Sequence, residues 1–582
     1  MVITLPEYPL TDAEIEALLS GGEESQPIAQ QWEVIVKYNG DLSAVQAGTQ
    51  ATVELLGDNF AILTLPPELI PRLYSFSQIE YIELPKDVSL TLRESMAAAC
   101  ITPVHSPGGR YRLSGQGVII GMVDSGIDFT HPDFRGENGD TRILFLWDQS
   151  GSGVPPSGFG HGVEYTAGAL NAALQSPQPY SVVPSMDRVG HGTGVAGISA
   201  GNGRSSGGME LGAAPRASLI VVKLGEGGRG GSARTTDIMR ALKYITDKAG
   251  ELGMPVAINL SFGTNNGSHG GSSLFEAYID SVAGRGKTVI VAATGNEGFA
   301  GHHFGGQLTQ GQTLDAPFRV DGGLSSVYLA LWKHFADTLD LELIAPGGQS
   351  SGVLRPTTPL VQMRLGQTAL TVHYGQPSFY NPNQEVFIQL KGSQGDVTPG
   401  IWQLFITGRQ VVQGDFHIWL PTIEEVGVTT AFLRPDPYMT LTLPSTATRV
   451  ISVGGYNAAI GAPADFSGRG YTFGQVQVKP DLVAPAVGVR TTRAGGGYDS
   501  FTGTSFAAPF VTGAAALMME WGIVKGNDPF LYGQRIKAFL QQSAIRTVGT
   551  PYPNPIWGYG ALCLGAAMDT LAEYNANRQG GR

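Results

Sequence analysis

Short runs of apolar residues that alternate with helical patterns limit the fold of this chain more than any other feature. The apolar runs lie at 117–123, 218–223, 256–260 and 288–293, with helical patterns between them, as at 235–249 and 272–282. Strands that are apolar throughout are typical of parallel sheets, because helices cover both of their faces. The alternation therefore predicts an α/β fold built on a doubly wound, mostly parallel sheet.

The pattern changes between about 300 and 438, where short alternating strands follow one another without a convincing helix. The candidate strands lie at 326–332, 339–343, 369–373, 385–390, 402–407 and 415–420. Many short strands separated by turns predict a β-sandwich. The α/β pattern resumes with a strand at 450–454 and a long helix at 506–521. We therefore expect an all-β domain at 299–438, inserted between two parts of one α/β domain, 97–298 and 439–582.

A separate small module precedes the α/β domain. A capping-box pattern at Thr11–Glu14 predicts a helix over 11–19, and a second short helix is expected at 67–75. Strands are expected at 33–38, 52–56, 60–65 and 79–84. These elements form an α+β module that ends near residue 90.

Composition excludes several classes of protein. Only 15% of the 582 residues are charged and 42% are hydrophobic, so the chain is not intrinsically disordered. The formal charge is −12 and no basic block is present, so we expect no nucleic-acid partner. No continuous apolar stretch reaches the ~18 residues of a membrane span, and the first residues lack the basic start of a secretory signal. We expect an intracellular protein without a membrane span.

Cysteine and histidine give little indication of a bound metal or cofactor. Cys100 and Cys563 are the only cysteines, and we expect both to be reduced, with a single bridge between them as the alternative. The pair His302-His303 has no nearby cysteine or acid cluster to complete a metal site, so we interpret it as a loop feature. We assign no metal and no cofactor.

Four motifs stand where a doubly wound sheet places its chemistry, at strand carboxyl ends or helix amino ends. Each motif carries one reactive side chain, and the four are Asp124 in Val-Asp-Ser-Gly, His191 in Gly-His-Gly-Thr-Gly, Asn296 in Thr-Gly-Asn-Glu-Gly and Ser505 in Gly-Thr-Ser-Phe-Ala-Ala-Pro. A second His-Gly pair at His161 leads into Val-Glu-Tyr-Thr and lacks this context, so we do not interpret His161 as a base.

These residue types fit nucleophilic catalysis. A serine hydroxyl needs a base within hydrogen-bond reach, and that base needs an orienting carboxylate. Asp124, His191 and Ser505 supply these groups in the chain order Asp, His, Ser, which distinguishes subtilisin from unrelated triads. The Asn296 amide and the Ser505 backbone N–H would stabilise the oxyanion.

All four motifs together resemble those of the subtilisin-like serine proteases, the subtilases, over roughly 110–298 and 440–570. The resemblance implies that Ser261, Phe262 and Gly263 form the strand that pairs with substrate backbone, and that Gly295 also contacts substrate. It implies a serine endopeptidase with a protein or peptide substrate. A silent pseudoprotease that senses or binds is the alternative from another class.

Within the subtilases, the order of domains is most similar to that of the clostridial Csp germination proteases. That resemblance implies that residues 1–96 are a prodomain, which acts as chaperone and inhibitor, and that the insert is a jelly-roll-like domain. The prodomain would be cut by the enzyme itself within an extended segment at 91–102. We expect cleavage between Met96 and Ala97, because methionine suits an apolar primary pocket. The implied substrate is the precursor of a spore-cortex-degrading enzyme, at an intracellular or spore-associated location. A general intracellular or released protease is the alternative.

Overall fold

The computed structural model describes ten stretches of the chain: residues 32–57, 59–66, 69–83, 92–105, 108–225, 233–357, 359–378, 380–393, 395–474 and 477–580. The helix expected at 11–19 lies outside them. One unit of the chain falls within Thr11–Val88, and residues from Ser89 onward belong to the other.

The amino-terminal unit is the expected α+β module. Its sheet has the order β2-β3-β1-β4 and is formed by β1 (Trp32–Tyr38), β2 (Thr52–Gly57), β3 (Phe60–Leu65) and β4 (Ile79–Glu83). All of its strand pairs are antiparallel. Two short helices, α2 (Ser43–Thr49) and α3 (Ile70–Leu73), belong to the same unit. Alternate residues of the strands, such as Leu63 and Leu65, are buried in its core.

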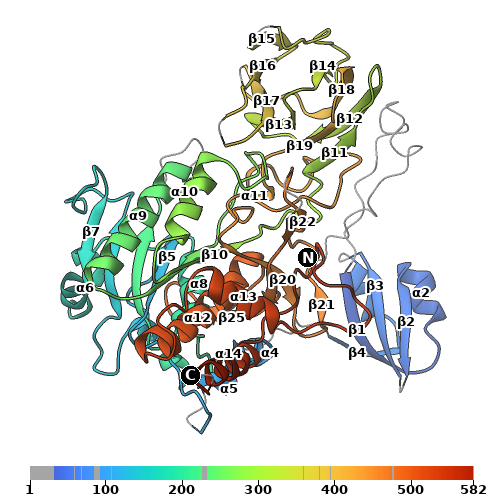
Figure 1. The fold of residues 1–582 in the computed structure, drawn as a ribbon. Helices are drawn as coiled ribbons and strands as arrows, with labels where there is room; N and C mark the ends of the chain where they lie inside the picture. Colours follow the sequence, from blue (N-terminus) through green and yellow to red (C-terminus); the bar gives the residue numbers. More distant parts are fainter. Residues whose placement is uncertain are drawn as a thin grey trace. The chain divides into compact units, whose positions relative to one another are not determined.

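A nine-stranded sheet forms the centre of the second unit (Figure 1). Its order is β21-β20-β10-β9-β5-β8-β6-β7, and β24 also pairs with β20. All of its pairs are parallel except β6 with β7 and β20 with β21. The strands are β5 (Ile119–Asp124), β6 (Ile143–Asp148), β7 (Val163–Thr166), β8 (Ser218–Lys223), β9 (Val256–Leu260), β10 (Thr288–Ala293), β20 (Ile451–Asn457), β21 (Ala462–Pro463) and β24 (Leu482–Pro485).

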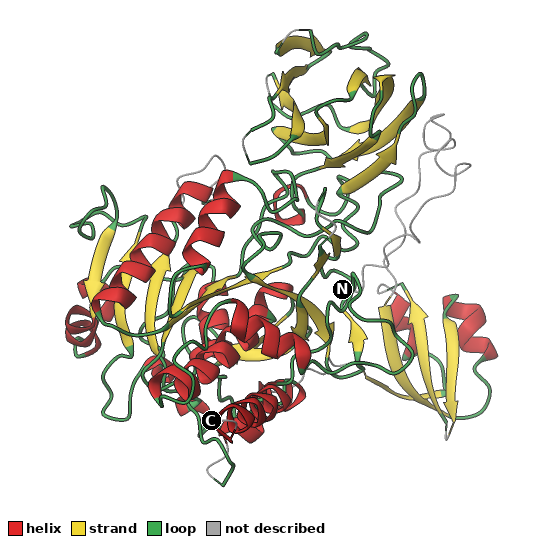
Figure 2. Cartoon of the chain, in the orientation of Figure 1, coloured by secondary structure: helices red, strands yellow, loops and turns green. Residues whose placement is uncertain are grey.

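Helices cover both faces of this sheet, as Figure 2 shows. On one face, α8 (His191–Ala200) and α12 (Ala508–Met519) share a core with α13 (Gln534–Gln542) and α14 (Leu564–Gly580). On the other, α9 (Thr235–Glu251) and α10 (Leu274–Ala283) pack over a second core. The short α6 (Ala167–Leu174) follows β7. Two buried faces explain why these strands are apolar along their whole length, and the doubly wound α/β prediction is confirmed.

Helix α12 lies at the centre of the larger core. The helical stretch Thr504–Val524, which includes α12, is long and apolar enough to cross a membrane, but 83% of its most apolar window is buried in the protein. Every residue from Ala508 to Met519 is buried. The apolar character of α12 is therefore accounted for by its packing between sheet and helices.

The insert forms two antiparallel sheets around one core. The six-stranded sheet has the order β11-β19-β13-β17-β16-β15, and the three-stranded sheet has the order β12-β18-β14. The strands are β11 (His303–Gln307), β12 (Thr313–Val320), β13 (Ser326–His334), β14 (Thr338–Ile344), β15 (Leu360–Leu365), β16 (Thr368–Tyr374), β17 (Asn383–Gly392), β18 (Gly400–Gln410) and β19 (Asp415–Trp419). Inward residues of both sheets make one cluster, so the insert is a β-sandwich.

The segment expected to be extended at 91–102 is instead helical. Residues Leu92–Ala98 form α4, and Thr102–His105 form α5. Met96 is only 2% exposed and packs with Leu92 and Ala99 in the core of the larger unit. The expected extended conformation is therefore wrong, because this segment belongs to the α/β unit. Both helices lie in the segment from Ser89 onward, which belongs to the larger unit.

Cys100 and Cys563 form a disulfide, so the expectation of two reduced cysteines is wrong. The two residues are 463 positions apart, and their Cα atoms lie 4.7 Å apart. Backbone hydrogen bonds from Leu564 to Ala99 and from Gly565 to Cys100 align the start of α14 with the chain after α4. The fold thus brings together two cysteines whose sequence separation gave no indication of pairing.

Candidate active site

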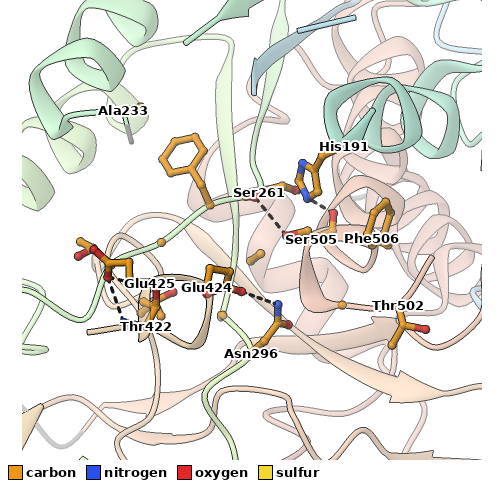
Figure 3. Close-up of a pocket in the computed structure, with 17 residues that line it drawn as sticks. His191, Ala233, Ser261, Asn296, Thr422, Glu424, Glu425, Thr502, Ser505 and Phe506 are labelled. Atoms are coloured by element: carbon orange, nitrogen blue, oxygen red, sulfur yellow. Dashed lines mark hydrogen bonds between the residues drawn. The ribbon is translucent and has the colours of Figure 1, made fainter. Parts of the chain in front are cut away.

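A cavity of about 420 Å³ contains side chains from three of the four motifs (Figure 3). His191, Asn296 and Ser505 line it, as do all of the residues expected to contact substrate, namely Ser261, Phe262, Gly263 and Gly295. Asp124 lies behind His191, only 3% exposed. The structure therefore brings together every residue expected at this site except Met96 and Ala97. The catalytic roles of these residues stay predictions made from the sequence.

Asp124 and His191 form a short hydrogen bond. Asp124 ends β5, His191 begins α8, and the His191 Nδ1 lies 2.7 Å from the Asp124 Oδ1. The same oxygen accepts a hydrogen bond from the Ser125 backbone N–H. Burial disfavours the charged imidazole, but the Asp124 carboxylate outweighs this effect, so the pKa of His191 is raised. The ring is therefore held with Nδ1 toward the carboxylate and Nε2 available to a nucleophile.

A second carboxylate, which sequence reasoning missed, holds the start of α8. Asp187 accepts hydrogen bonds from the backbone N–H groups of Gly190 and Thr193 and from the Thr193 hydroxyl. It also accepts one from the Ser125 hydroxyl, directly after Asp124. An acid three residues before the Gly-His-Gly that starts a helix is a capping signal that could have been found in the sequence. Asp187 therefore positions both members of the Asp–His pair.

Ser505 lies in a single 3-10 turn, Thr504–Phe506, that leads into α12. Its hydroxyl donates to the Ser261 carbonyl oxygen over 3.1 Å. Figure 3 shows the His191 ring beside it, and that ring packs edge-on against Phe506. Catalytic hydrogen bonds often tighten only when substrate is bound. A rotation of the Ser505 hydroxyl from Ser261 toward His191 would complete the triad.

A buried chain of polar side chains fixes the backbone of Ser505. The Thr512 hydroxyl on α12 donates to the Asn259 Oδ1, and the Asn259 Nδ2 donates to the Ser261 hydroxyl. That hydroxyl donates in turn to the Ser505 carbonyl over 2.8 Å. Sequence reasoning missed Asn259, although an amide within the apolar run 256–260 is a signal. Fully paired networks of this kind make a buried site rigid.

The Asn296 amide is oriented from one side by Thr504. Its Oδ1 accepts hydrogen bonds from the Thr504 backbone N–H over 3.0 Å and from the Thr504 hydroxyl. This leaves Nδ2 facing the cavity, where it donates to the Glu424 Oε1 over 3.3 Å (Figure 3). The amide therefore presents its N–H beside Ser505, as an oxyanion donor must.

Glu297, the next residue, connects this loop to the chain that returns from the β-sandwich. It is buried, and it accepts hydrogen bonds from the Ile423 backbone N–H, the His302 ring over 2.6 Å and the Asn265 amide. Ile423 begins α11 (Ile423–Val426), which carries Glu424 to Asn296. Asn296 thus bonds to Glu424, and Glu297 bonds to the adjacent residue, Ile423. The chain that returns from the insert is attached directly to the loop that carries Asn296.

Of the pair His302-His303, His302 lies in a loop, as expected from the sequence, whereas His303 lies in a strand, and both side chains are buried. His302 bonds to Glu297, and His303 is the first residue of β11. The His303 Nε2 lies 3.0 Å from the His417 Nδ1. The His303 ring stacks on both the His417 ring and the Trp419 ring. Within the part of the chain that the structure describes, no group of three or more His, Cys, Asp or Glu residues is placed to hold a metal ion.

Together the fold and the site define a subtilisin-like serine protease. A model of the subtilase family matches residues 115–327 and 437–560, more than half of the chain. The chain therefore belongs to the subtilase family. A second model, the Csp protease B prodomain, matches residues 9–86.

The most informative solved structure is that of the CspB protease of Clostridium perfringens. It is 37% identical, with a TM-score of 0.77, and the match covers 83% of this chain and 98% of that one. M-protease of Shouchella clausii strain KSM-K16 is 30% identical over 69% of this chain and 90% of its own length. The PI-type proteinase of Lactococcus lactis subsp. cremoris is 23% identical over 86% of this chain, which spans only 28% of that protein. The resemblance to Csp proteases is confirmed.

Proposed function

We propose that the protein is a serine endopeptidase that hydrolyses peptide bonds through an acyl-enzyme. The observation that carries the proposal is the Asp124–His191 hydrogen bond, with Ser505 and Asn296 on the same cavity. As the Ser505 hydroxyl attacks the scissile carbonyl, His191 takes its proton and Asn296 donates to the oxyanion. His191 then protonates the leaving amine. Water hydrolyses the ester with His191 again acting as the base.

We also propose that the chain is made as a zymogen that cuts itself. The match of residues 9–86 to the Csp protease B prodomain supports this proposal. Met96 is buried within α4, which argues against the Met96–Ala97 bond unless α4 unfolds. A cut nearer the boundary at Val88–Ser89 agrees better with the two units. Likeness to the Csp proteases supports two finer proposals: an inactive precursor of a spore-cortex-degrading enzyme as the substrate, and an intracellular or spore-associated location.

Labelling and peptide cleavage test the endopeptidase proposal, and intact mass tests the zymogen proposal. The purified wild-type chain should be labelled at Ser505 by a fluorophosphonate and should cleave a mixed peptide library, whereas Ser505→Ala should do neither. Intact mass should show a shortened wild type and a full-length Ser505→Ala chain. A wild type that is neither labelled nor able to cleave any peptide would support the pseudoprotease alternative. Peptide cleavage by Ser505→Ala would exclude Ser505 as the nucleophile.

A further inference from the structure

A second cavity, of about 790 Å³, lies at the other end of the parallel strands from the active site. Gln116 lines it shortly before β5, Arg142 directly before β6 and Arg216 two residues before β8. These three strands are neighbours and run parallel, so the cavity is at their amino ends. Asp124 is the last residue of β5, at the carboxyl end. The length of a strand therefore separates this cavity from the reaction centre.

Guanidinium groups dominate the charge around this cavity. Three arginines line it, namely Arg142, Arg204 and Arg216, and Glu137 is the one acidic residue among the described residues of the lining. The Arg216 Nη2 lies 3.7 Å from the Glu137 Oε1, but the Glu137 side chain is 90% exposed, so solvent screens this pair. Arg204 donates to the Gly136 carbonyl over 2.6 Å. The cavity thus has an excess of positive charge in a chain whose formal charge is −12.

Arg142 is a largely buried cation that is held by backbone carbonyls. Its Nη1 donates to the Ala217 carbonyl over 2.7 Å, and its Nη2 donates to the carbonyls of Asp133 and Ala200. Its Nε has no hydrogen-bond partner among the described residues. No carboxylate in that part of the chain forms an ion pair with Arg142. The guanidinium is therefore fixed in position without an adjacent counter-charge.

The charge of Arg142 persists in spite of its burial. Burial lowers the pKa of Arg142 to about 10, and the Asp133 carboxylate opposes this lowering. That carboxylate is itself occupied, because it accepts hydrogen bonds from the Ser205 backbone N–H and the Tyr498 hydroxyl. Arg142 is thus protonated at neutral pH. A buried charge without a counter-charge is unfavourable, and an anion in the cavity would remove this cost.

We propose that this cavity binds a small polyanion that carries carboxylate or phosphate groups. Planar guanidinium groups bind both kinds of oxyanion through paired hydrogen bonds, which are stronger than those between neutral groups. Three arginines against one exposed carboxylate favour a ligand with more than one negative charge. A cavity of about 790 Å³ has the size of a small-molecule site. The binding does not depend on the proposed endopeptidase function, because no residue of the reaction centre lines this cavity.

Calorimetric titration of the full-length Ser505→Ala chain tests the proposal, since this variant stays whole whether or not the wild type cuts itself. Pyrophosphate and citrate are the two probes, and sodium chloride of equal ionic strength is the blank. We expect at least one probe to bind with one ion per chain, which also decides between phosphate and carboxylate. The affinity should fall as salt is added, because the site is charged and open to solvent. Absence of binding by both probes at millimolar concentration would overturn the proposal.

Arg204→Gln and Arg216→Gln, each added to Ser505→Ala, remove one charge from the cavity and leave the buried Arg142 in place. Each should weaken binding of the probe by about tenfold, because a charge-assisted hydrogen bond is lost. Arg240→Gln is the matched control: Arg240 is a half-exposed arginine on α9 that pairs with Asp237 and does not line the cavity. This variant should bind as the parent does. Equal weakening in all three variants, or in none, would contradict binding at this cavity.

Discussion

The Asp124 Oδ1 lies 2.7 Å from the His191 Nδ1, although the two residues are 67 positions apart in the chain. Their contact depends on close backbone packing, since a side chain on Gly192 would meet the Gly126 carbonyl and the Asp124 carboxylate. The Asp124 Oδ2 has no hydrogen-bond partner in the described chain, so the interaction with His191 is carried by one oxygen. This pair sets both the tautomer and the pKa of the base.

Asp124→Asn should lower kcat by about 10⁴-fold, because the amide no longer holds the imidazole in the required tautomer. The raised pKa of His191 predicts that wild-type kcat/KM increases with pH through a midpoint above the ordinary value of 6.5. Since the Asp124 charge causes the increase, the residual activity of Asp124→Asn should have its midpoint at lower pH. A pH profile of both proteins measures this shift. Equal midpoints would contradict it.

Asn296→Ala should lower kcat by about 10²- to 10³-fold with little change in KM, because the amide acts on the oxyanion rather than on bound substrate.

Glu424 accepts a hydrogen bond from the Asn296 Nδ2 in the resting site and places a negative charge near the developing oxyanion. Glu424→Gln should therefore raise kcat on neutral peptides, by a few-fold. Glu425→Gln is the control, because its carboxylate is bound to Thr422. An equal gain in both variants would mean a general charge effect.

Glu297→Ala would leave the Ile423 N–H, the His302 ring and the Asn265 amide without their shared acceptor. We expect a loss of about 3–5 kcal/mol in the free energy of unfolding, since each buried donor left without an acceptor costs about 1–3 kcal/mol. Glu297→Gln retains one acceptor oxygen and should lose less. In Glu297→Gln, kcat should fall while KM stays constant, because fewer hydrogen bonds hold α11 to the loop of Asn296. Urea unfolding and steady-state kinetics measure the two effects.

The His303–His417 pair predicts a loss of stability at mildly acidic pH. Burial lowers the pKa of both rings; the neighbouring His269 lowers the pKa of His303 further, and His303 and His269 lower that of His417 further. At His417 the Asp436 carboxylate opposes this lowering. Unfolded histidines bind protons below about pH 6.5, whereas these folded rings stay neutral, so stability is complete above pH 6.5 and falls as pH decreases. Each ring should cost about 2 kcal/mol at pH 5.

His417→Gln can still donate to His303 but does not titrate, so its unfolding midpoint in urea should fall less than that of wild type between pH 7 and pH 5. An identical pH dependence in both proteins would exclude this pair as the cause.

The disulfide between Cys100 and Cys563 should stabilise the larger unit. The double variant Cys100→Ser with Cys563→Ser should lose about 2–5 kcal/mol of unfolding free energy, because the unfolded chain is no longer constrained. Wild type treated with a reductant should unfold at the same urea concentration as the double variant, and the reductant should not affect the variant. Thiol labelling of unreduced, unfolded wild type that finds two free thiols would contradict the bridge.

The sequence predicted the parts of the fold that depend on local patterns of apolar and polar residues. Apolar runs such as 256–260 and 288–293 correspond to β9 and β10, and alternating strands predicted the β-sandwich. The four local motifs also located three residues that line one cavity and Asp124, which bonds to one of them. These predictions succeeded because a strand buried on both faces is apolar throughout, and a strand buried on one face alternates apolar and polar residues. Both patterns can be recognised within a few consecutive residues.

The missed features depend on contacts between distant segments. The helix α4 forms because Leu92 and Met96 pack into a core made by the rest of the chain, which no local window shows. In the sequence, Glu297 looks like a turn residue, and its role is visible only in the fold, where it binds Ile423 and His302. Tertiary packing, rather than propensity, decides these positions.

The bridge between Cys100 and Cys563 has one more consequence for a protease exposed to its own activity. Asp124, His191, Asn296 and Ser505 all lie between the two cysteines, so the whole reaction centre sits within a covalently closed ring. A single nick anywhere in that ring opens the ring but releases no fragment. On a denaturing gel, a molecule cut once in a surface loop would therefore migrate as one species without reductant and as two fragments with reductant. Damage that would split an ordinary chain leaves this one in one piece.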